Sequence, residues 1–120
     1  MIKNGNVSEI NKNYKNWFLG KFVKEPEFST ENSRDFEVKW SVRESGYFHP
    51  PKDKVVNDDT CSSMVLCIKG KFKYSFIKES GEYEDFILES EGDFVRWTPD
   101  INHKVEVLED AIILTIRWYK

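Results

Sequence analysis

The chain has 120 residues and a formal net charge of −3, with acidic and basic side chains interspersed. This length suits one domain with a single core, and the absence of a basic face argues against binding to a nucleic acid polymer. The longest apolar run, residues 111–114, is too short to cross a membrane, and the first residues hold no apolar signal-peptide core. We therefore expect a cytoplasmic protein without a membrane partner.

Residues 1–16 are rich in asparagine and poor in apolar side chains. Such a composition does not offset the conformational entropy that is lost on ordering. We predict a flexible N-terminal arm at residues 1–16, with at most a helical turn at 7–10, followed by a single β-barrel domain at residues 17–120.

The first predicted strands are residues 17–23, which are strongly aromatic, and residues 36–43, which alternate without a break. In the second strand the apolar side chains share one face and the polar side chains the other, and strict alternation is typical of a strand with one buried face. A short extended piece follows at residues 47–49. The polar segment 52–60 is a loop long enough to be either functional or mobile.

The second half of the chain continues with short strands and turns. Residues 63–76 predict a hairpin that turns at Gly70, and residues 83–88 predict a strand after the turn at Gly81. A further strand at 94–97 ends before Pro99, which has a fixed φ and no amide donor. After a turn at 109–110, the apolar residues 111–118 predict a buried closing strand.

His103 begins a strand in which it shares a face with Val105 and Val107. A titratable imidazole therefore lies on the apolar side of this strand. In total, roughly eight or nine short strands with frequent turns and no long helix indicate an all-β sandwich or barrel.

The segment from Gly92 to His103 resembles the second conserved motif of the cupin superfamily, G-x5-P-x-G-x2-H. The spacing from glycine to histidine is kept, whereas the proline stands one residue late, at Pro99, and residues 100–102 contain no second glycine. The resemblance extends from about Phe36 to Trp118. It implies an all-β fold, the cupin-type double-stranded β-helix or jelly-roll barrel, in which the two motifs line the mouth.

The first cupin motif, G-x5-H-x-H-x3,4-E-x6-G, is degenerate in this chain. If Gly70 is its last glycine, Ser63 occupies the glutamate position. The two histidine positions then fall on Asn57 and Asp59 or, with the longer gap, on Val56 and Asp58.

The resemblance therefore leaves a single histidine of the usual metal-binding set. One imidazole among neutral side chains binds divalent metals weakly. We expect no tightly bound metal and no other cofactor. If a rearranged metal site exists, its ligands would be His103, His49 and Asp59.

His103 is the main candidate for a functional residue. In a pocket, a neutral imidazole could donate a hydrogen bond to a ligand or act as a general base. The structural alternative is a half-buried histidine that is bonded to a backbone carbonyl. His49, just before Pro50, is either a surface residue or a second imidazole of the site, and Tyr74 is the third candidate catalytic group.

Aromatic and arginine side chains are the candidate ligand contacts. Trp40 and Trp97 are either core residues or stacking walls for a planar ring, with Tyr74 adding a phenol. Arg43 and Arg96 are candidate anion contacts because a guanidinium matches a carboxylate or phosphate bidentately. For Arg117 we favour a salt bridge.

Three functions are compatible with these residues. The first is a cupin-like binding protein without a metal that holds an anionic or aromatic metabolite in the barrel. The second is a metal-independent isomerase or epimerase of sugars or keto acids that uses His103 or His49 as its base. The third is a metal-dependent cupin oxygenase or isomerase with a rearranged site. The resemblance also implies a homodimer, because exposed edge strands need covering.

Overall fold

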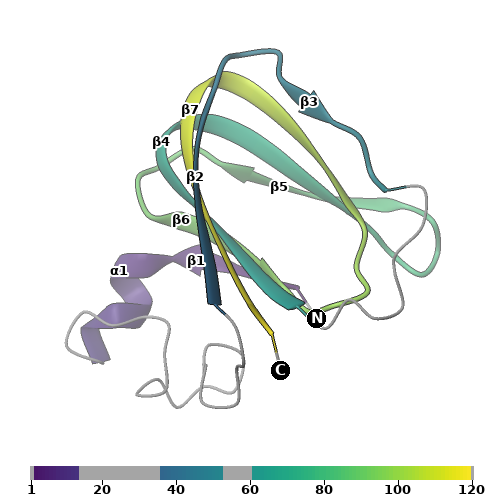
Figure 1. The fold of residues 1–120 in the computed structure, drawn as a ribbon, viewed down its shortest axis with the longest axis horizontal. Helices are drawn as coiled ribbons and strands as arrows, with labels where there is room; N and C mark the ends of the chain where they lie inside the picture. Colours follow the sequence, from purple (N-terminus) through teal and green to yellow (C-terminus); the bar gives the residue numbers. More distant parts are fainter. Residues whose placement is uncertain (1, 14–35, 53–60, 120) are drawn as a thin grey trace.

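The structure is a computed structural model that describes residues 2–13, 36–52 and 61–119. It confirms the all-β prediction, since nearly all of this part of the chain forms one seven-stranded antiparallel sheet (Figure 1). The elements are β1 (Ile2–Asn6), α1 (Val7–Ile10), the 3-10 turn η1 (Asn11–Asn13), β2 (Phe36–Arg43), β3 (Phe48–His49), β4 (Cys61–Ile77), β5 (Tyr83–Leu88), β6 (Asp93–Trp97) and β7 (His103–Tyr119). The predicted strand at 17–23 and most of the predicted loop at 52–60 lie outside the described residues.

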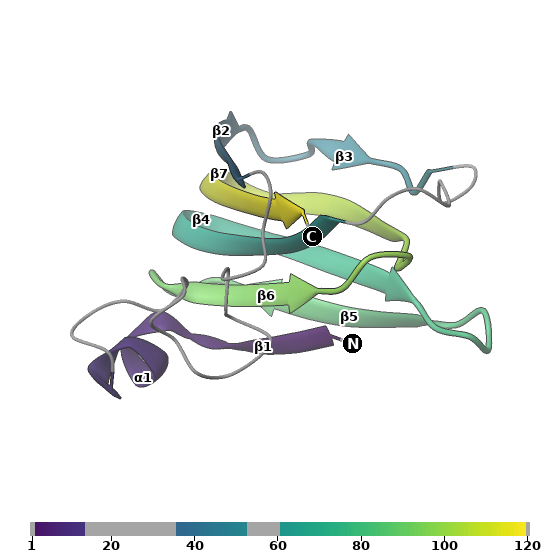
Figure 2. The same ribbon diagram turned by 60° about the horizontal axis from the view of Figure 1, so that its bottom comes forward.

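The sheet folds into two halves because its two longest strands belong to both. The strand order is β1-β6-β4-β7-β2, with β5 added on β4 and β3 on β7. The first part of β4 pairs with β6 and with the end of β7, whereas its last part pairs with β5 and with the start of β7. Figures 1 and 2 show both strands curving from one side of the molecule to the other, so that the halves enclose an interior.

The bend in these strands corrects two predictions. We expected a hairpin turn at Gly70 and a turn at residues 109–110, but β4 and β7 continue through both places. Their pairing shifts register between Cys67 and Phe72. Gly70 has a φ of 89°, and a Cβ on it would lie 2.1 Å from the carbonyl oxygen of Asp110. The glycine is therefore required for close approach at a bulge rather than for a chain reversal.

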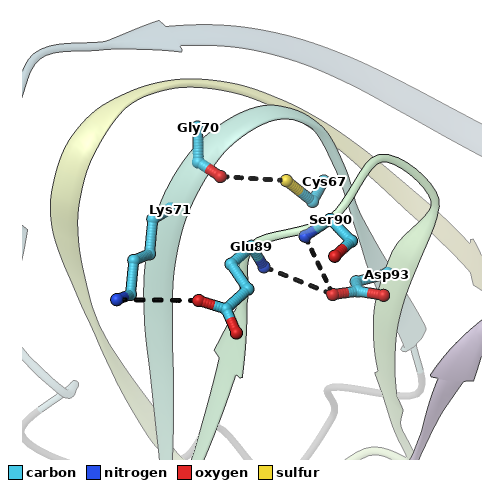
Figure 3. A network of polar contacts seen from close by, with 6 residues as sticks. All are labelled: Cys67, Gly70, Lys71, Glu89, Ser90 and Asp93. Carbon is cyan, nitrogen blue, oxygen red and sulfur yellow. Dashed lines mark hydrogen bonds and ion pairs between the residues drawn. The ribbon is translucent and has the colours of Figure 1, made fainter.

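Polar contacts hold the β5–β6 turn against this bend (Figure 3). The carboxylate of Asp93 accepts hydrogen bonds from the backbone amides of Glu89 at 3.3 Å and Ser90 at 3.0 Å. Lys71 forms an ion pair with Glu89, with a nitrogen–oxygen distance of 3.6 Å. The Cys67 thiol donates to the carbonyl oxygen of Gly70 at 3.5 Å. These contacts fix the turn at which the segment resembling the cupin motif begins.

The sheet has two apolar faces. The interior is filled by side chains of β4, β5, β6 and β7, namely Val65, Cys67, Phe72, Tyr74, Phe76, Leu88, Val95, Trp97, Val105, Val107, Ala111 and Ile113. A second cluster on the opposite face contains Met64, Leu66, Phe94, Ile116 and Trp118. Burial on both faces explains why the start of β4 reads as a continuous apolar run.

The apolar face of β2 points outward, although its alternation favoured burial. Val38 pairs with Ile116 and Trp40 with Leu114, which places both on the face opposite the interior. The exposed fractions are 58% for Val38, 58% for Trp40 and 71% for Val42. The polar face of β2 consequently faces the interior. Alternation shows that the two faces differ, but the pairing with β7 decides which one turns inward.

Within the predicted arm, residues 2–6 form the strand β1, which we did not predict, and the helical turn expected at 7–10 is present as α1. β1 pairs with β6 along its whole length, and the Val7 amide donates to the carbonyl oxygen of Gly92 at 3.0 Å. The Asn6 amide group donates to Asp93 at 3.0 Å. Backbone pairing with an existing strand orders a segment whose side chains bury little apolar surface. No helix in the described ranges is long and apolar enough to span a membrane.

Candidate functional site

A cavity of about 690 Å³ opens between the inner face of β2 and the segment that joins β6 to β7. Its described lining residues are Val38, Lys39, His49, Lys52, Cys61, Ser63, Tyr74, Trp97, Thr98, Pro99, Asp100, Ile101, Asn102, His103, Thr115 and Arg117. We call this the outer cavity. It is large enough for a small-molecule ligand, since such pockets usually measure about 300 to 1,000 Å³.

A smaller cavity of about 110 Å³ adjoins the outer cavity, and we call it the inner cavity. The two cavities share five lining residues: Lys39, His49, Tyr74, His103 and Thr115. The inner cavity is further lined by Ser41, Arg43, Tyr47, Val105 and Ile113. Since both cavities border the same side chains, a ligand could extend from one into the other.

His103 lies among aromatic rings where the two cavities meet. Its ring centroid is 4.9 Å from that of Trp97, 5.4 Å from that of Tyr74 and 5.8 Å from that of Phe76. Burial, and to a smaller extent the nearby His49, Lys52 and Lys39, lower the pKa of His103 from 6.5 to about 4. The imidazole is therefore neutral at pH 7.

The turn before β7 holds His103 and Lys52 together. Asp100 adopts a φ of 70°, which aspartate tolerates better than most residues. The Asn102 side-chain oxygen accepts hydrogen bonds from the backbone amides of His103 and Lys52, both at 3.0 Å. Its amide group donates to the carbonyl oxygen of Lys52 at 2.7 Å. The Asn102 side chain thus connects the segment after β3 to the first residue of β7 by hydrogen bonds.

Tyr74 lines both cavities and is 7% exposed. Burial raises the pKa of its phenol above the ordinary value; the neighbouring Tyr47 raises it further and Arg43 lowers it. The phenol therefore stays protonated and can donate a hydrogen bond at any physiological pH.

Positive charge gathers at the cavities even though the chain as a whole is acidic. Lys39, Lys52 and Arg117 line the outer cavity, and Arg43 lines the inner cavity with its guanidinium 4.3 Å from the centre of the Tyr47 ring. Asp100 is the one acidic residue among the lining residues that the structure describes. The arrangement suits an anionic ligand.

The structure brings five of the predicted site residues to the cavities. His103, His49 and Tyr74 line both cavities, Trp97 lines the outer cavity and Arg43 lines the inner cavity. His49 reaches them because β3 pairs with β7 opposite Val105.

Three predicted residues are not among these lining residues. Trp40 points outward from β2 and is 58% exposed. Arg96 is buried on the opposite face of the sheet, where its guanidinium lies 5.9 Å from the Trp118 ring. Both miss the cavities because the pairing of their strands turns their side chains away from the interior. Asp59 lies outside the described residues.

The sequence reasoning missed several cavity residues, chiefly Lys39, Ser41, Lys52, Asn102 and Thr115. Lys39 and Ser41 belong to the polar face of β2, which would normally be assigned to solvent. Arg117, for which we favoured a salt bridge, is an exposed residue that lines the outer cavity. The alternation of Lys39, Ser41 and Arg43 was the sequence signal that these side chains share one face of β2. Without the strand pairing, this pattern does not show whether that face points to solvent or to the interior.

The described residues do not form the metal site of the third hypothesis. His49 and His103 both line the cavities, but within residues 2–13, 36–52 and 61–119 no three His, Cys, Asp or Glu side chains lie close enough together to hold a metal ion. His49 and His103 alone are too few donors for a 2-His-1-carboxylate centre, and Asp59, the predicted carboxylate, lies outside the described residues. We therefore derive no metal chemistry from this site.

Comparison with solved structures identifies the fold. ChmJ, a 3'-monoepimerase from Streptomyces bikiniensis in complex with dTDP-quinovose, superposes with a TM-score of 0.58 at 13% identity, over 68% of this chain and 44% of ChmJ. The rmlC epimerase of Mycobacterium tuberculosis gives 0.56 at 15% identity, over 72% and 46%. The 11S allergen of Cocos nucifera gives 0.58 at 13% identity, over 70% and 23%.

The matched part covers less than half of each of these three proteins. No protein-family model and no curated protein matches this chain. At this level of identity the likeness concerns the fold alone. The chain therefore has the cupin-like antiparallel fold that these two epimerases and the 11S allergen share.

Proposed function

We propose that the protein binds a small anionic metabolite with a planar or cyclic body in its two cavities, without a tightly bound metal. The observation that carries the proposal is the surplus of positive charge among the described residues that line an aromatic-walled cavity in an acidic chain. Trp97 and His103 offer ring faces for stacking, and Lys39, Lys52 and Arg117 offer cations.

The neutral state of His103 supports binding over proton abstraction. A general base works best when its pKa is close to the working pH. With a pKa of about 4, His103 is a weak base at pH 7. A neutral imidazole still donates one hydrogen bond and accepts another, so it can orient a ligand.

A thermal-shift screen with nucleotides, nucleotide sugars and keto acids tests the proposal, together with elemental analysis of the untagged protein. A ligand at one hundred times its dissociation constant stabilises the fold by about 2.7 kcal/mol, which is several degrees for a domain of this size. Trp97→Ala should abolish the shift, whereas Trp40→Ala on the outward face should preserve it. No shift with any ligand class, or about one metal per chain, would refute the proposal.

Sugar or keto-acid isomerisation is the second candidate function. Two of the similar structures are sugar epimerases, and His49, Tyr74 and His103 all line the inner cavity. In this reading a histidine takes the proton from the carbon next to a carbonyl, and the carbon is reprotonated later. Incubation of a bound sugar or keto acid in D₂O distinguishes the functions by NMR. Exchange of that proton, lost in His103→Gln or His49→Gln, would favour the enzyme over the binding protein.

We also propose that the chain forms a homodimer through the outward face of β2. Trp40 and Val42 are exposed apolar residues that line neither cavity, and β2 pairs with β7 alone among the described strands. Light scattering after gel filtration should give a dimer that Trp40→Glu converts to a monomer. Ile87→Glu, at a residue of β5 that is 53% exposed, is the matched control and should leave the dimer intact. A wild-type monomer at all concentrations would refute this part of the proposal.

A further inference from the structure

The two cavities differ in what they can hold. A cavity of about 150 Å³ accommodates benzene, whereas one water molecule takes about 30 Å³ of liquid volume. The inner cavity, at about 110 Å³, is smaller than this benzene site and large enough for a carboxylate or a phosphate group. The outer cavity, at about 690 Å³, has room for the ring and its substituents.

Tyr74 presents a donor to these cavities. The side chain is 7% exposed, and its hydroxyl makes no hydrogen bond with any residue that the structure describes. Among the described residues, every fully buried side-chain nitrogen or oxygen has a hydrogen-bond partner. The hydroxyl oxygen is therefore not fully enclosed by protein atoms. Because Arg43 and Tyr47 both affect the phenol electrostatically, this oxygen lies near the inner cavity.

The cations of the inner cavity face no carboxylate among the described residues that line it. Arg43 and Lys39 line it, and none of its described lining residues is an aspartate or glutamate. The only described contact of the Arg43 guanidinium is with the Tyr47 ring. A partly buried guanidinium is normally paired with an anion. A partly buried guanidinium, the exposed Lys39 and a hydroxyl donor consequently border a space of oxyanion size.

We propose that Arg43, Lys39 and the Tyr74 hydroxyl form an oxyanion subsite in the inner cavity, which receives the acidic group of the ligand while its ring lies in the outer cavity. This inference rests on the proposed binding function and specifies it. The ligand class is a cyclic or aromatic acid in which the acidic group extends from the ring. Its carboxylate or phosphate accepts bonds from the guanidinium and the phenol, as charge-assisted recognition requires.

NMR titrations of the ¹⁵N-labelled full chain with benzoate, benzamide and inorganic phosphate at constant ionic strength test the subsite. Benzoate and benzamide share a planar ring, but only benzoate carries the charge. A charge-assisted hydrogen bond contributes about 1.5 to 3 kcal/mol, so benzoate should bind at least about tenfold more tightly than benzamide. The Arg43 side-chain Nε signal should shift with benzoate and not with benzamide.

Matched variants separate charge from structure. Arg43→Gln should remove the preference for benzoate, whereas Lys78→Gln, which removes the same charge from an exposed turn, should keep it. Tyr74→Phe keeps the ring contacts with Trp97 and His103 and should weaken benzoate binding several-fold. Melting curves of each variant confirm that it is folded.

The outcomes distinguish the subsite from the binding function. If benzoate and benzamide bind equally and shift Trp97 and His103 alone, the cavity binds ligands but the subsite does not exist. If phosphate shifts Arg43 and benzoate does not, the subsite holds for a phosphate and the carboxylate is excluded. If no probe shifts any cavity residue, the subsite is refuted, and the screen with larger metabolites then decides the binding function separately.

Discussion

Replacement of His103 by phenylalanine should make the protein less sensitive to acid. Phenylalanine keeps an aromatic ring among Tyr74, Trp97 and Phe76 and cannot be protonated. In the folded wild type, burial and nearby positive charge lower the pKa of His103 from 6.5 to about 4. Between these pH values the unfolded chain binds a proton that the folded chain rejects.

The sign and size of the effect follow from this difference in pKa. The contribution of neutral His103 to stability is fully present above pH 6.5 and is lost as the pH falls through 4. The full loss is about 3 kcal/mol, because each pKa unit corresponds to about 1.4 kcal/mol. About 2.5 kcal/mol of it is lost between pH 7.5 and 4.5.

Urea unfolding of wild type and His103→Phe at both pH values measures this loss. Other groups that titrate in this range contribute equally to both proteins, so the difference between the two losses isolates His103. The wild type should lose about 2.5 kcal/mol more than the variant. Equal losses would show that the imidazole is solvated in the folded protein, and NMR titration of its Hε1 signal would then give a pKa close to 6.5 instead of about 4.

Three further substitutions test the fold and the site. Gly70→Ala should lower the free energy of unfolding by clearly more than the ~1–2 kcal/mol expected for Gly46→Ala. Both glycines have a positive φ, but only a Cβ on Gly70 would lie within 3 Å of backbone atoms. Equal losses of stability in urea unfolding would contradict the close approach of the two strands at Gly70. Asn102→Ala should lower the free energy of unfolding by about 1–2 kcal/mol and accelerate hydrogen exchange of the Lys52 amide, with the Lys78 amide unchanged as the control. An unchanged exchange rate at Lys52 would show that the hydrogen bonds from Asn102 do not protect this amide. Trp118→Ala, at a residue that is 1% exposed, should cost about 3–5 kcal/mol in thermal or urea unfolding, whereas a monomeric sample of Trp40→Ala should lose less than about 1 kcal/mol. Similar losses would mean that Trp40 is buried rather than exposed.

The sequence by itself determined the strand content and the position of the central histidine. Alternation predicted β2, the turn residues predicted the boundaries of β5 and β6, and the spacing from Gly92 to His103 predicted a histidine at the start of β7. These features are local, because they depend on side-chain propensity, on glycine with positive φ and on proline. The resemblance of this segment to a cupin motif was sufficient to predict the fold class.

Glycine was the residue that local reasoning misread. Gly70, between two apolar stretches, has the same local pattern in a hairpin turn and in a bulge of a continuous strand. Only the pairing of β4 with β7 on both sides of the glycine shows that the strand continues. The order of residues 2–6 likewise depends on a partner strand about ninety positions later in the chain.

Only the tertiary structure decided which face of β2 enters the barrel and therefore what the site contains. Its apolar face is exposed, and its polar face brings Lys39, Ser41 and Arg43 to the cavities. A strand's sequence defines two faces, but its partner's register determines which one points inward. The same cause excludes Trp40 and Arg96 from the cavities. The chemistry of the site thus arises from long-range pairing, which no local pattern encodes.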